Sequence, residues 1–285
     1  MTRSPTVPLR LVALALVALF AASGCAMFKK KDREEPQNVP VEELFEEGHR
    51  AMTRGNWTGA ATTYRRLVAQ YPYGPYTEQA LIETAYAQYK AGRHEEAISS
   101  IDRFLRTYPT HRHAAYMYYL RGLVNSSRDT VFLQRVWSLD PSRRDMATHR
   151  QAYNDFEIVT ERYPNSRYAA DAAERMGELR EVFARHEVEI GLYYLRRTAF
   201  VAATERANYL LETYPASNYR DDAIALLAAA YDGLGNDSLA ASAREQLQQA
   251  NPAHPYLDGE WPKYPGTWRK LNPVGSEKTA LDMEY

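Results

Sequence analysis

The chain contains a single cysteine, Cys25, and its thiol is the most reactive group that the sequence offers. Three small residues, Ala22, Ser23 and Gly24, stand directly before it. A lone thiol in an oxidising compartment has no disulfide partner, so it is a liability unless a covalent reaction consumes it. Attachment of a lipid to the sulfur is a reaction of that kind.

The residues before Cys25 have the organisation of a signal peptide. Arg3 and Arg10 supply a positive amino-terminal region, and residues 11–22 form an apolar run of 12 residues. That run is well short of the roughly 20 residues that span a bilayer as a helix. A signal peptide over residues 1–24 therefore fits better than a membrane-spanning anchor.

The junction resembles the bacterial lipoprotein signal, in which cleavage leaves the cysteine first and its thiol receives a diacylglycerol. Ala22 departs from the usual Leu three positions before the cysteine. The resemblance implies lipid attachment at Cys25, and several acyl chains anchor a protein stably where one chain does not. Ala26, in place of Asp, implies passage to the outer membrane with the protein body in the periplasm. The alternative is a soluble secreted protein whose cysteine is incidental.

The other reactive residues do not form a catalytic pattern. The sequence has no phosphate-binding glycine loop, no nucleophile elbow and no His-Glu-x-x-His motif. His111 and His113 are expected to point to different sides at a helix start, as solvated loop histidines and a poor metal pair. Asp221 and Asp222 are adjacent and fit a helix N-terminus. The sequence predicts no enzyme, no metal and no cofactor besides a lipid on Cys25.

Composition narrows the class of partner. The chain has 35 Lys+Arg against 36 Asp+Glu, and this balance excludes a typical nucleic-acid binder. It has 22 tyrosines against 8 phenylalanines, and tyrosine packs an apolar ring while offering a polar tip to a partner. Residues 26–40, AMFKKKDREEPQNVP, contain few apolar side chains. Residues 25–40 are therefore predicted to be a lipidated tether.

A recurring Tyr-Pro pair organises the chain from residue 41 onward. It stands at Tyr71-Pro72, Tyr108-Pro109, Tyr163-Pro164 and Tyr214-Pro215, with a degraded copy at Asn251-Pro252. The successive prolines are 37, 55, 51 and 37 residues apart. Two intervals lie close to the 34 residues of a tetratricopeptide repeat, and the two longer ones fit a repeat plus an insertion.

Each copy has the internal pattern of a helix hairpin. Small residues 12 positions apart mark the helix contact in four copies: Gly48 and Ala60, Ala85 and Ala97, Gly191 and Ala203, Ala228 and Ala240. A close helix crossing needs small side chains, and glycines between the paired positions suit the turn. The pattern resembles the tetratricopeptide repeat closely. It predicts an all-α solenoid of about five helix hairpins.

Two irregularities divide the predicted array. Copy three has its first helix near 113–126 and its second beginning near Ala147, which leaves an insertion over 127–146 that contains Phe132 and Trp137. Inserted loops in solenoids often emerge on the binding face. Residues 167–197 contain no proline and are predicted to form one long helix.

These features predict an N-terminal sub-array over 41–166 and a C-terminal sub-array over 167–252. Residues 253–285 follow as an irregular tail rich in proline and tryptophan. The tail is expected either to lie along the solenoid through Trp261 and Trp268 or to become ordered only on a partner.

Without a catalytic pattern, function is expected to reside in surfaces. In stacked helix hairpins the first helices line the concave face. The groove positions of the tetratricopeptide family correspond here to Phe45, His49, Met52, Ile82, Tyr86, Tyr89 and Tyr116. An aromatic groove suits an extended peptide or a helix. The alternative for each tyrosine is a place in the core between repeats.

The whole arrangement resembles the BamD family of outer-membrane assembly lipoproteins. Segments such as "DPSRRD" and "DFEIVTERYPNSRYAADA" carry the resemblance, which extends from about Leu44 to Pro252. It implies a non-catalytic scaffold that acts with other assembly lipoproteins and docks through its C-terminal copies on the periplasmic domains of the barrel-forming BamA subunit. It also implies that unfolded outer-membrane proteins bind at the N-terminal copies.

The resemblance also implies a docking site. The segment "FVAATERANYLLETYP" matches the stretch with which the family contacts BamA. Arg206 is the residue expected to form a salt bridge with an acidic residue of the partner, and Tyr209 is expected to lie beside it.

Two other functions remain as alternatives. One is a periplasmic tetratricopeptide adaptor for cell-wall or envelope-constriction enzymes, although residues 26–40 lack the heptads of an oligomerisation segment. The other is a hydrolase built in the 127–146 insertion, which contains Asp129, Asp140 and Arg143 but no evident nucleophile.

Overall fold

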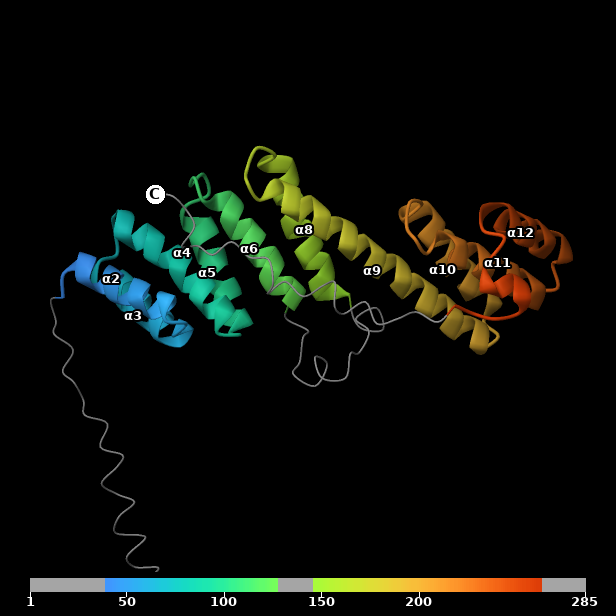
Figure 1. The fold of residues 1–285 in the computed structure, drawn as a ribbon, viewed down its shortest axis with the longest axis horizontal. Coiled ribbons are helices and arrows are strands. Elements are labelled where there is room, and N and C mark those ends of the chain that lie inside the picture. Colours follow the sequence, from blue (N-terminus) through green and yellow to red (C-terminus); the bar gives the residue numbers. More distant parts are fainter. Residues whose placement is uncertain (1–38, 128–145, 263–285) are drawn as a thin grey trace, which may run out of the picture. The chain divides into compact units, whose positions relative to one another are not determined.

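The computed structural model describes residues 39–127 and 146–262, and every regular element in these ranges is helical (Figure 1). The elements are α2 (Val41–Thr53), α3 (Trp57–Gln70), α4 (Pro75–Lys90), α5 (His94–Thr107), α6 (Ala114–Ser127), α8 (Ala147–Arg162), α9 (Ala169–Arg196), α10 (Phe200–Thr213), α11 (Arg220–Gly233), α12 (Asp237–Ala250) and the short 3-10 helix η2 (Pro255–Asp258). The predicted all-α class is confirmed. Cys25, the signal peptide, most of the insertion with Phe132 and Trp137, and Trp268 lie outside the described residues.

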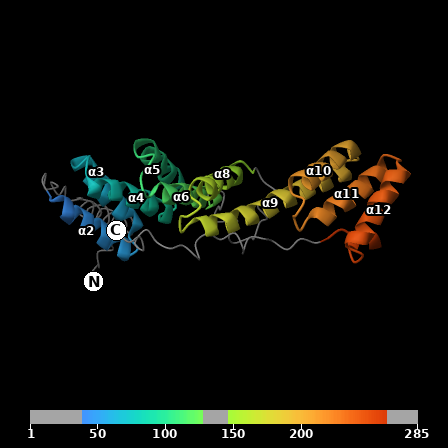
Figure 2. The same cartoon turned by 90° about the horizontal axis from the view of Figure 1, so that it is seen from above.

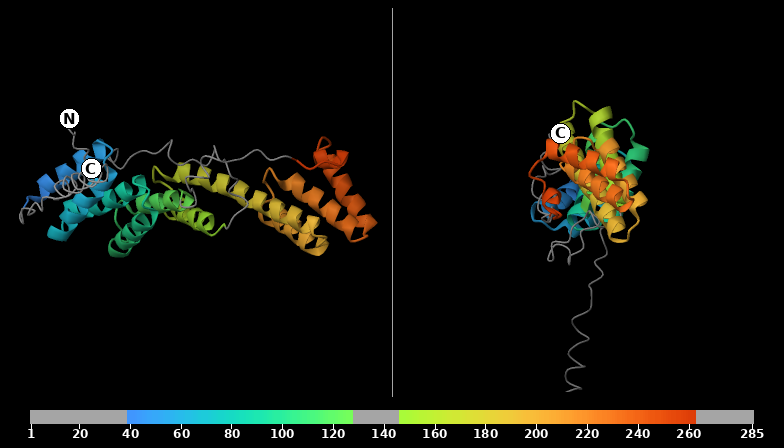
Figure 3. Two further views of the ribbon diagram at one scale, coloured as in Figure 1. Left: turned by 90° about the horizontal axis from the view of Figure 1, so that it is seen from below. Right: turned by 90° about the vertical axis from the view of Figure 1, so that its right-hand side faces the viewer.

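The helices pair into hairpins that stack in chain order. Within the described ranges, α2 packs on α3, α4 on α5, α6 on α8, α9 on α10 and α11 on α12. The second helix of each hairpin also packs on the first helix of the next, from α3 on α4 to α10 on α11. Figure 2 and the left view of Figure 3 show this succession from above and from below. The five predicted tetratricopeptide-like hairpins are therefore present.

Glycines allow some of these helices to approach closely. A Cβ atom on Gly48 would lie 2.6 Å from the Tyr64 ring, and one on Gly122 would lie 2.5 Å from the Phe156 ring. A close helix contact at Gly48 was predicted, but with Ala60 and not Tyr64 as the opposite residue. The contact at Gly122 was missed because copy three is interrupted by its insertion. Gly191 lies against Leu226 of α11, so its small size serves the contact with the next hairpin.

The Tyr-Pro pairs end the second helix of four hairpins. Tyr71, Tyr108, Tyr163 and Tyr214 are the C-cap residues of α3, α5, α8 and α10, and each backbone N–H donates to the carbonyl four residues earlier. The following proline has no N–H with which to continue the helix. Between paired helices, Gly55, Gly92 and Gly235 adopt φ values of 72°, 73° and 70°, the left-handed conformation predicted for these turns.

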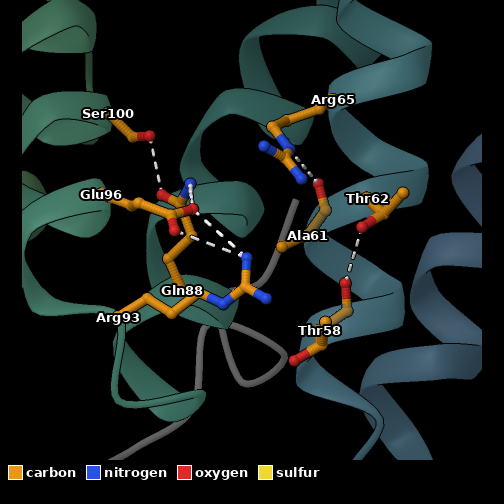
Figure 4. Close-up of polar contacts among 8 residues, drawn as sticks. All are labelled: Thr58, Ala61, Thr62, Arg65, Gln88, Arg93, Glu96 and Ser100. Atoms are coloured by element: carbon orange, nitrogen blue, oxygen red, sulfur yellow. Dashed lines mark hydrogen bonds and ion pairs between the residues drawn. The ribbon is translucent and has the colours of Figure 1, made fainter.

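Polar side chains also join the two helices of a hairpin. In the second hairpin, the buried amide of Gln88 accepts a hydrogen bond from the Ser100 hydroxyl at 2.7 Å and donates to Glu96 at 3.4 Å (Figure 4). Arg93 in the turn pairs with the same Glu96 carboxylate at 3.4 Å. Because an unsatisfied buried amide is costly, these contacts favour one register of α4 against α5.

Ion pairs connect the second hairpin to the third. The guanidinium of Arg121 on α6 contacts Asp102 on α5 at 2.7 Å and Asp155 on α8 at 2.6 Å. Asn125 donates a further hydrogen bond to Asp155 at 2.9 Å. Asp155 is only 4% exposed, and these contacts offset the free-energy cost of burying its carboxylate.

The long helix predicted over 167–197 is present as α9, which has 28 residues. Its first half packs along α8 and its second half along α10 (Figure 1). It also contacts α11. The hydroxyl of Tyr119 on α6 donates to Asp171 in the first turn of α9 at 2.6 Å.

The segment after α12 is fixed to the start of α11. His254 is buried, and its Nε2 lies 3.1 Å from Asp222, while Asn251 donates to Asp221 at 3.2 Å. Both aspartates lie in the first turn of α11, as predicted, where acids favour the helix dipole. The ring of Trp261 lies 5.1 Å from that of Tyr256, so the irregular tail begins as a structured cap.

The packing at Gly48 yields a stability prediction. Gly48→Ala should lower the apparent free energy of unfolding by about 1 to 2 kcal/mol, because overpacking against the buried Tyr64 ring outweighs the helix propensity gained. Urea denaturation followed by circular dichroism measures the change.

Gly177→Ala on α9 is the matched control, because the nearest atom to its added Cβ is 3.9 Å away on the flexible Arg180 side chain. This variant should be more stable than the unmodified protein by about 0.5 to 1 kcal/mol. Equal effects of the two substitutions would contradict the packing argument.

Candidate functional site

A pocket of about 530 Å3 opens beside the first two hairpins. Its lining comes from α2, from the start of α4 and from the turn before α6: Phe45, Pro75, Tyr76, Glu78, Gln79, Thr110, His111 and Arg112. The rings of Phe45 and Tyr76 lie 5.4 Å apart and form an apolar wall. Tyr76 remains 39% exposed.

Hydrogen bonds orient the histidine of this pocket. The Nδ1 atom of His111 accepts the backbone N–H of His113 at 3.1 Å, so in the neutral ring the proton is on Nε2. Nε2 lies 3.2 Å from Glu78, to which it donates. The Glu78 carboxylate therefore accepts a hydrogen bond from His111 within the pocket.

The same turn carries positive charge. Burial first, and then the nearby Arg112, His111 and Arg167, lower the pKa of His113 to about 4. Arg112 is exposed at the pocket and forms no ion pair with a residue in the described ranges. The pocket thus combines an aromatic wall with an available cation, which suits an apolar side chain next to a carboxylate.

The sequence-based expectation for His111 and His113 was wrong. Their rings lie 5.3 Å apart instead of pointing to different sides, and His111 is largely buried. The cause is the turn after Tyr108, whose carbonyl accepts the N–H of His111 and brings the ring against α4. No group of three or more His, Cys, Asp or Glu residues in the described ranges could hold a metal ion.

A buried carboxyl group lies behind the pocket. Gln79 lines the pocket, and its Nε2 donates to Glu83 Oε1 at 2.7 Å. Glu83 is 1% exposed, and its Oε2 has no hydrogen-bond partner among the described residues. Burial raises the pKa of Glu83 to about 7, against the smaller opposing effect of the Gln79 hydrogen bond.

Most of the groove positions expected from the sequence are buried. Met52, Ile82, Tyr86, Tyr89 and Tyr116 are between 0% and 5% exposed, so the prediction that they line an open groove is wrong. The reason is the stacking of hairpins, which covers α4 with α2, α3, α5 and α6. The alternative, a place in the core between repeats, applies to these side chains.

Two groove positions differ from this set. Phe45 is 9% exposed and lines the pocket, and His49 is partly exposed on α2. Sequence reasoning missed Tyr76 and Arg112, because their role depends on the turn before α6 lying against the start of α4. The dense aromatic stretch "YPYGPY" at 71–76 was the available signal.

A second surface contains the two predicted docking residues. Arg206 and Tyr209 lie on α10, where their side chains are 41% and 39% exposed, the second value taken over the whole residue. The Arg206 guanidinium contacts the buried carboxylate of Glu187 on α9 at 3.2 Å. The ring of Tyr209 lies 6.2 Å from that of Tyr214. Arg206 therefore already has an intramolecular partner, while part of its side chain faces solvent.

Comparison with known proteins identifies the family. Residues 37–247 match the family model YfiO, described as outer membrane lipoprotein. The chain is 57% identical over 282 residues to an outer membrane protein assembly factor BamD of Xylella fastidiosa (strain 9a5c), covering 98% of this chain and 96% of that protein. It belongs to the BamD family.

A more distant relative has the same family name. A BamD of Neisseria meningitidis serogroup A is 36% identical over 243 residues, covering 85% of this chain and 91% of that protein. Among solved structures, a tetratricopeptide repeat protein from Parabacteroides merdae has a TM-score of 0.32 and 15% identity, covering 75% of this chain and 67% of that one.

Membership of the BamD family makes this chain one of the outer-membrane protein assembly factors and agrees with the resemblance found in the sequence. The family description also associates it with the outer membrane. In the described ranges, no helix combines the length and the apolar character needed to cross a membrane.

Glu83 yields a pH prediction. Its folded-state pKa of about 7 lies above the ordinary value of 4.5, so its neutral form stabilises the fold. The stabilising contribution is present below about pH 4.5 and is lost as the pH rises through 7. Glu83→Gln should therefore be more stable than the unmodified protein at pH 8, by on the order of 2 to 3 kcal/mol, and nearly equal at pH 5.

Urea denaturation at both pH values tests this expectation. Glu43→Gln, at an exposed position on α2, is the control. In this variant the difference in the free energy of unfolding between pH 5 and pH 8 should be the same as in the unmodified protein. A Glu83→Gln variant with the same pH dependence as the unmodified protein would show that the carboxyl group does not titrate in this range.

Proposed function

We propose that this chain is a non-catalytic scaffold lipoprotein of the outer-membrane β-barrel assembly complex. It is anchored to the outer membrane through a lipid on Cys25 and faces the periplasm. Its C-terminal hairpins dock on the periplasmic domains of a BamA-type subunit, and its N-terminal hairpins receive unfolded outer-membrane proteins. Family membership supports the general role, and the two surfaces described above are the sites proposed for the two interactions.

The pocket beside the first two hairpins is the observation that carries the proposal. An unfolded outer-membrane protein presents aromatic side chains and chain-terminal or side-chain carboxylates. The Phe45 and Tyr76 rings offer rigid contact area for the first, and Arg112 offers a cation for the second. Recognition by a preformed pocket requires little ordering of the scaffold.

An affinity purification from detergent-solubilised envelope tests the proposal as a whole. The full lipidated chain should capture a β-barrel subunit with periplasmic repeat domains in near-stoichiometric amount, identified by mass spectrometry. Capture of cell-wall synthases in its place would support the adaptor alternative and contradict the assembly role.

The pocket makes a specific prediction for substrate binding. Tyr76→Ala combined with Arg112→Gln should reduce photocrosslinking to a C-terminal peptide of an outer-membrane protein by roughly tenfold or more, because both an aromatic wall and a charged contact are lost. Helicity should be unchanged, since both side chains are at the surface.

Tyr73→Ala combined with Arg106→Gln is the matched control. Tyr73 is 88% exposed in the loop directly before α4, Arg106 is exposed on α5, and neither lines the pocket. Equal crosslinking by the two double variants would exclude the pocket as the substrate site.

Arg206 makes a specific prediction for docking. Truncation of a hydrogen-bonded charge that an interface buries typically costs about 2 to 5 kcal/mol. Arg206→Ala should therefore weaken binding to purified periplasmic domains of the BamA-type subunit by roughly 30-fold or more, as measured by biolayer interferometry.

Arg244→Ala is the control. Arg244 lies on α12, is partly exposed, and forms an ion pair with Asp232 of α11. Thermal denaturation of both variants shows whether loss of the Glu187 partner unfolds the Arg206 variant. Unchanged binding by folded Arg206→Ala would remove this residue from the docking site.

A further inference from the structure

The pocket beside the first two hairpins continues onto the next turn between hairpins. Arg112 lines the pocket and is exposed, and Arg167, in the turn before α9, is exposed as well. Burial is the main cause that lowers the pKa of His113 to about 4, and both arginines contribute to the effect. Because both act on one histidine, the two turns lie close together. Residues 108–113 and 163–168 contain no acidic residue, so these turns form a positively charged edge of the pocket.

Stacked rings fix the position of the second arginine. The Arg167 guanidinium lies 5.2 Å from the centre of the Tyr168 ring. That ring lies 5.3 Å from the ring of Tyr116 and 5.1 Å from the ring of Tyr119, and both of these tyrosines belong to α6. The turn before α9 is therefore held against α6, and its cation is positioned before any ligand binds.

The pocket thus offers two different sides to a ligand. The aromatic wall, Phe45 and Tyr76, suits apolar side chains, and the charged edge, Arg112 and Arg167, suits carboxylates. An extended peptide places successive side chains on alternate sides of its backbone. A segment in which apolar and acidic residues alternate would therefore satisfy both sides of the pocket at once.

The chain itself contains such a segment. Residues 281–285, LDMEY, alternate apolar and acidic side chains and contain no basic residue. They lie outside the described residues. Elsewhere in the sequence outside the described ranges, no two acids are separated by a single apolar residue. Charge and spacing therefore favour residues 281–285 over the tether and over the insertion as an occupant.

The segment is long enough to reach the pocket. The last described residue, Pro262, follows η2, and the buried His254 next to η2 contacts Asp222 in the first turn of α11. Six helix-to-helix steps lead from α11 through α10, α9, α8, α6 and α5 to α4, at about 8 to 10 Å each. Half of α9 adds a perpendicular offset of about 20 Å. The resulting span is roughly 50 to 65 Å, whereas residues 263–284 extend to about 75 Å at most.

We propose that residues 281–285 bind in the pocket of their own chain as an autoinhibitory segment. Its apolar side chains contact the aromatic wall, and Asp282 and Glu284 pair with Arg112 and Arg167. A tethered segment has an effective concentration of about 1 mM, so weak contacts suffice to occupy the site. Docking of the segment stands by itself, whereas its competition with substrate rests on the proposed function of the pocket.

Photocrosslinking tests the docking. The full lipidated chain in detergent carries p-benzoylphenylalanine at position 283, on the apolar side of the segment. Mass spectrometry of an equal mixture of isotope-labelled and unlabelled chains separates crosslinks within a chain from those between chains. The crosslink should join position 283 to α2 or to the start of α4 within one chain. Crosslinks mainly between chains, or mainly to other helices, would overturn the proposal.

Charge reversal tests the polar half of the contact. Asp282→Lys combined with Glu284→Lys should reduce the crosslink roughly tenfold or more, because like charges then face the two arginines. Glu260→Lys combined with Glu277→Lys is the matched control, since it changes the net charge equally outside residues 281–285. This control should keep the crosslink, and equal losses in the two double variants would contradict specific pairing.

Reversal of the pocket charges provides the complementary test. In the chain with lysines at 282 and 284, Arg112→Glu combined with Arg167→Glu should restore most of the crosslink. Both arginines are exposed, so these substitutions leave the core intact. Failure to recover the crosslink would exclude the two arginines as partners of the segment.

Peptide binding tests the regulatory consequence. Deletion of residues 279–285 should strengthen binding of a C-terminal outer-membrane-protein peptide roughly five- to tenfold, as measured by fluorescence anisotropy, because a bound segment leaves only a fraction of the pockets open. Equal peptide affinity with and without the segment would overturn the autoinhibitory role. If neither chain binds the peptide while the crosslink still forms, the proposed substrate function fails and docking of the segment stands.

Discussion

The packing of a large side chain onto a glycine at several helix contacts is the constraint on which the rest of the structure depends. Tyr64 over Gly48, Phe156 over Gly122 and Leu226 over Gly191 bring helix axes close together. Close approach allows a second helix to contact both its own hairpin and the next one. A series of short helices, each marginal alone, thus acquires a continuous core.

This mode of packing also determines where ligands can bind. The aromatic rings of the first helices, such as Tyr86 and Tyr116, are used in the core and are closed to partners. The available surfaces lie at helix ends and along the flanks of α9. The pocket with Phe45 and Tyr76 is built where a turn meets the start of α4, and loops positioned by a rigid scaffold commonly carry binding residues.

Buried polar groups add geometric definition to the array. Asp155 and Glu187 are almost completely buried, and each is matched by an arginine from a neighbouring helix. Buried ion pairs contribute little net stability, but breaking one leaves a costly unpaired charge. Such pairs therefore favour one arrangement of α6 with α8 and of α9 with α10, and the proposed docking residue Arg206 lies at the second of these contacts.

The sequence alone determined the elements and their order. Tyr-Pro pairs, turn glycines such as Gly55 and small residues such as Gly48 act through local backbone geometry and contacts within one hairpin, so their spacing predicted the helix hairpins and the long helix α9. The family resemblance came from the same local patterns. These features need no knowledge of which distant segments meet.

Which side chains remain at the surface depends on how the helices pack against one another. A period of 3.6 residues shows which positions share a helix face, but it does not show which neighbouring helix covers that face. Tyr86 was therefore assigned to a groove although it is buried, whereas His111 was assigned to solvent although it lies against α4. The pocket brings together Phe45 and Arg112, which are 67 positions apart, and its existence depends on the turn before α6 lying against the start of α4.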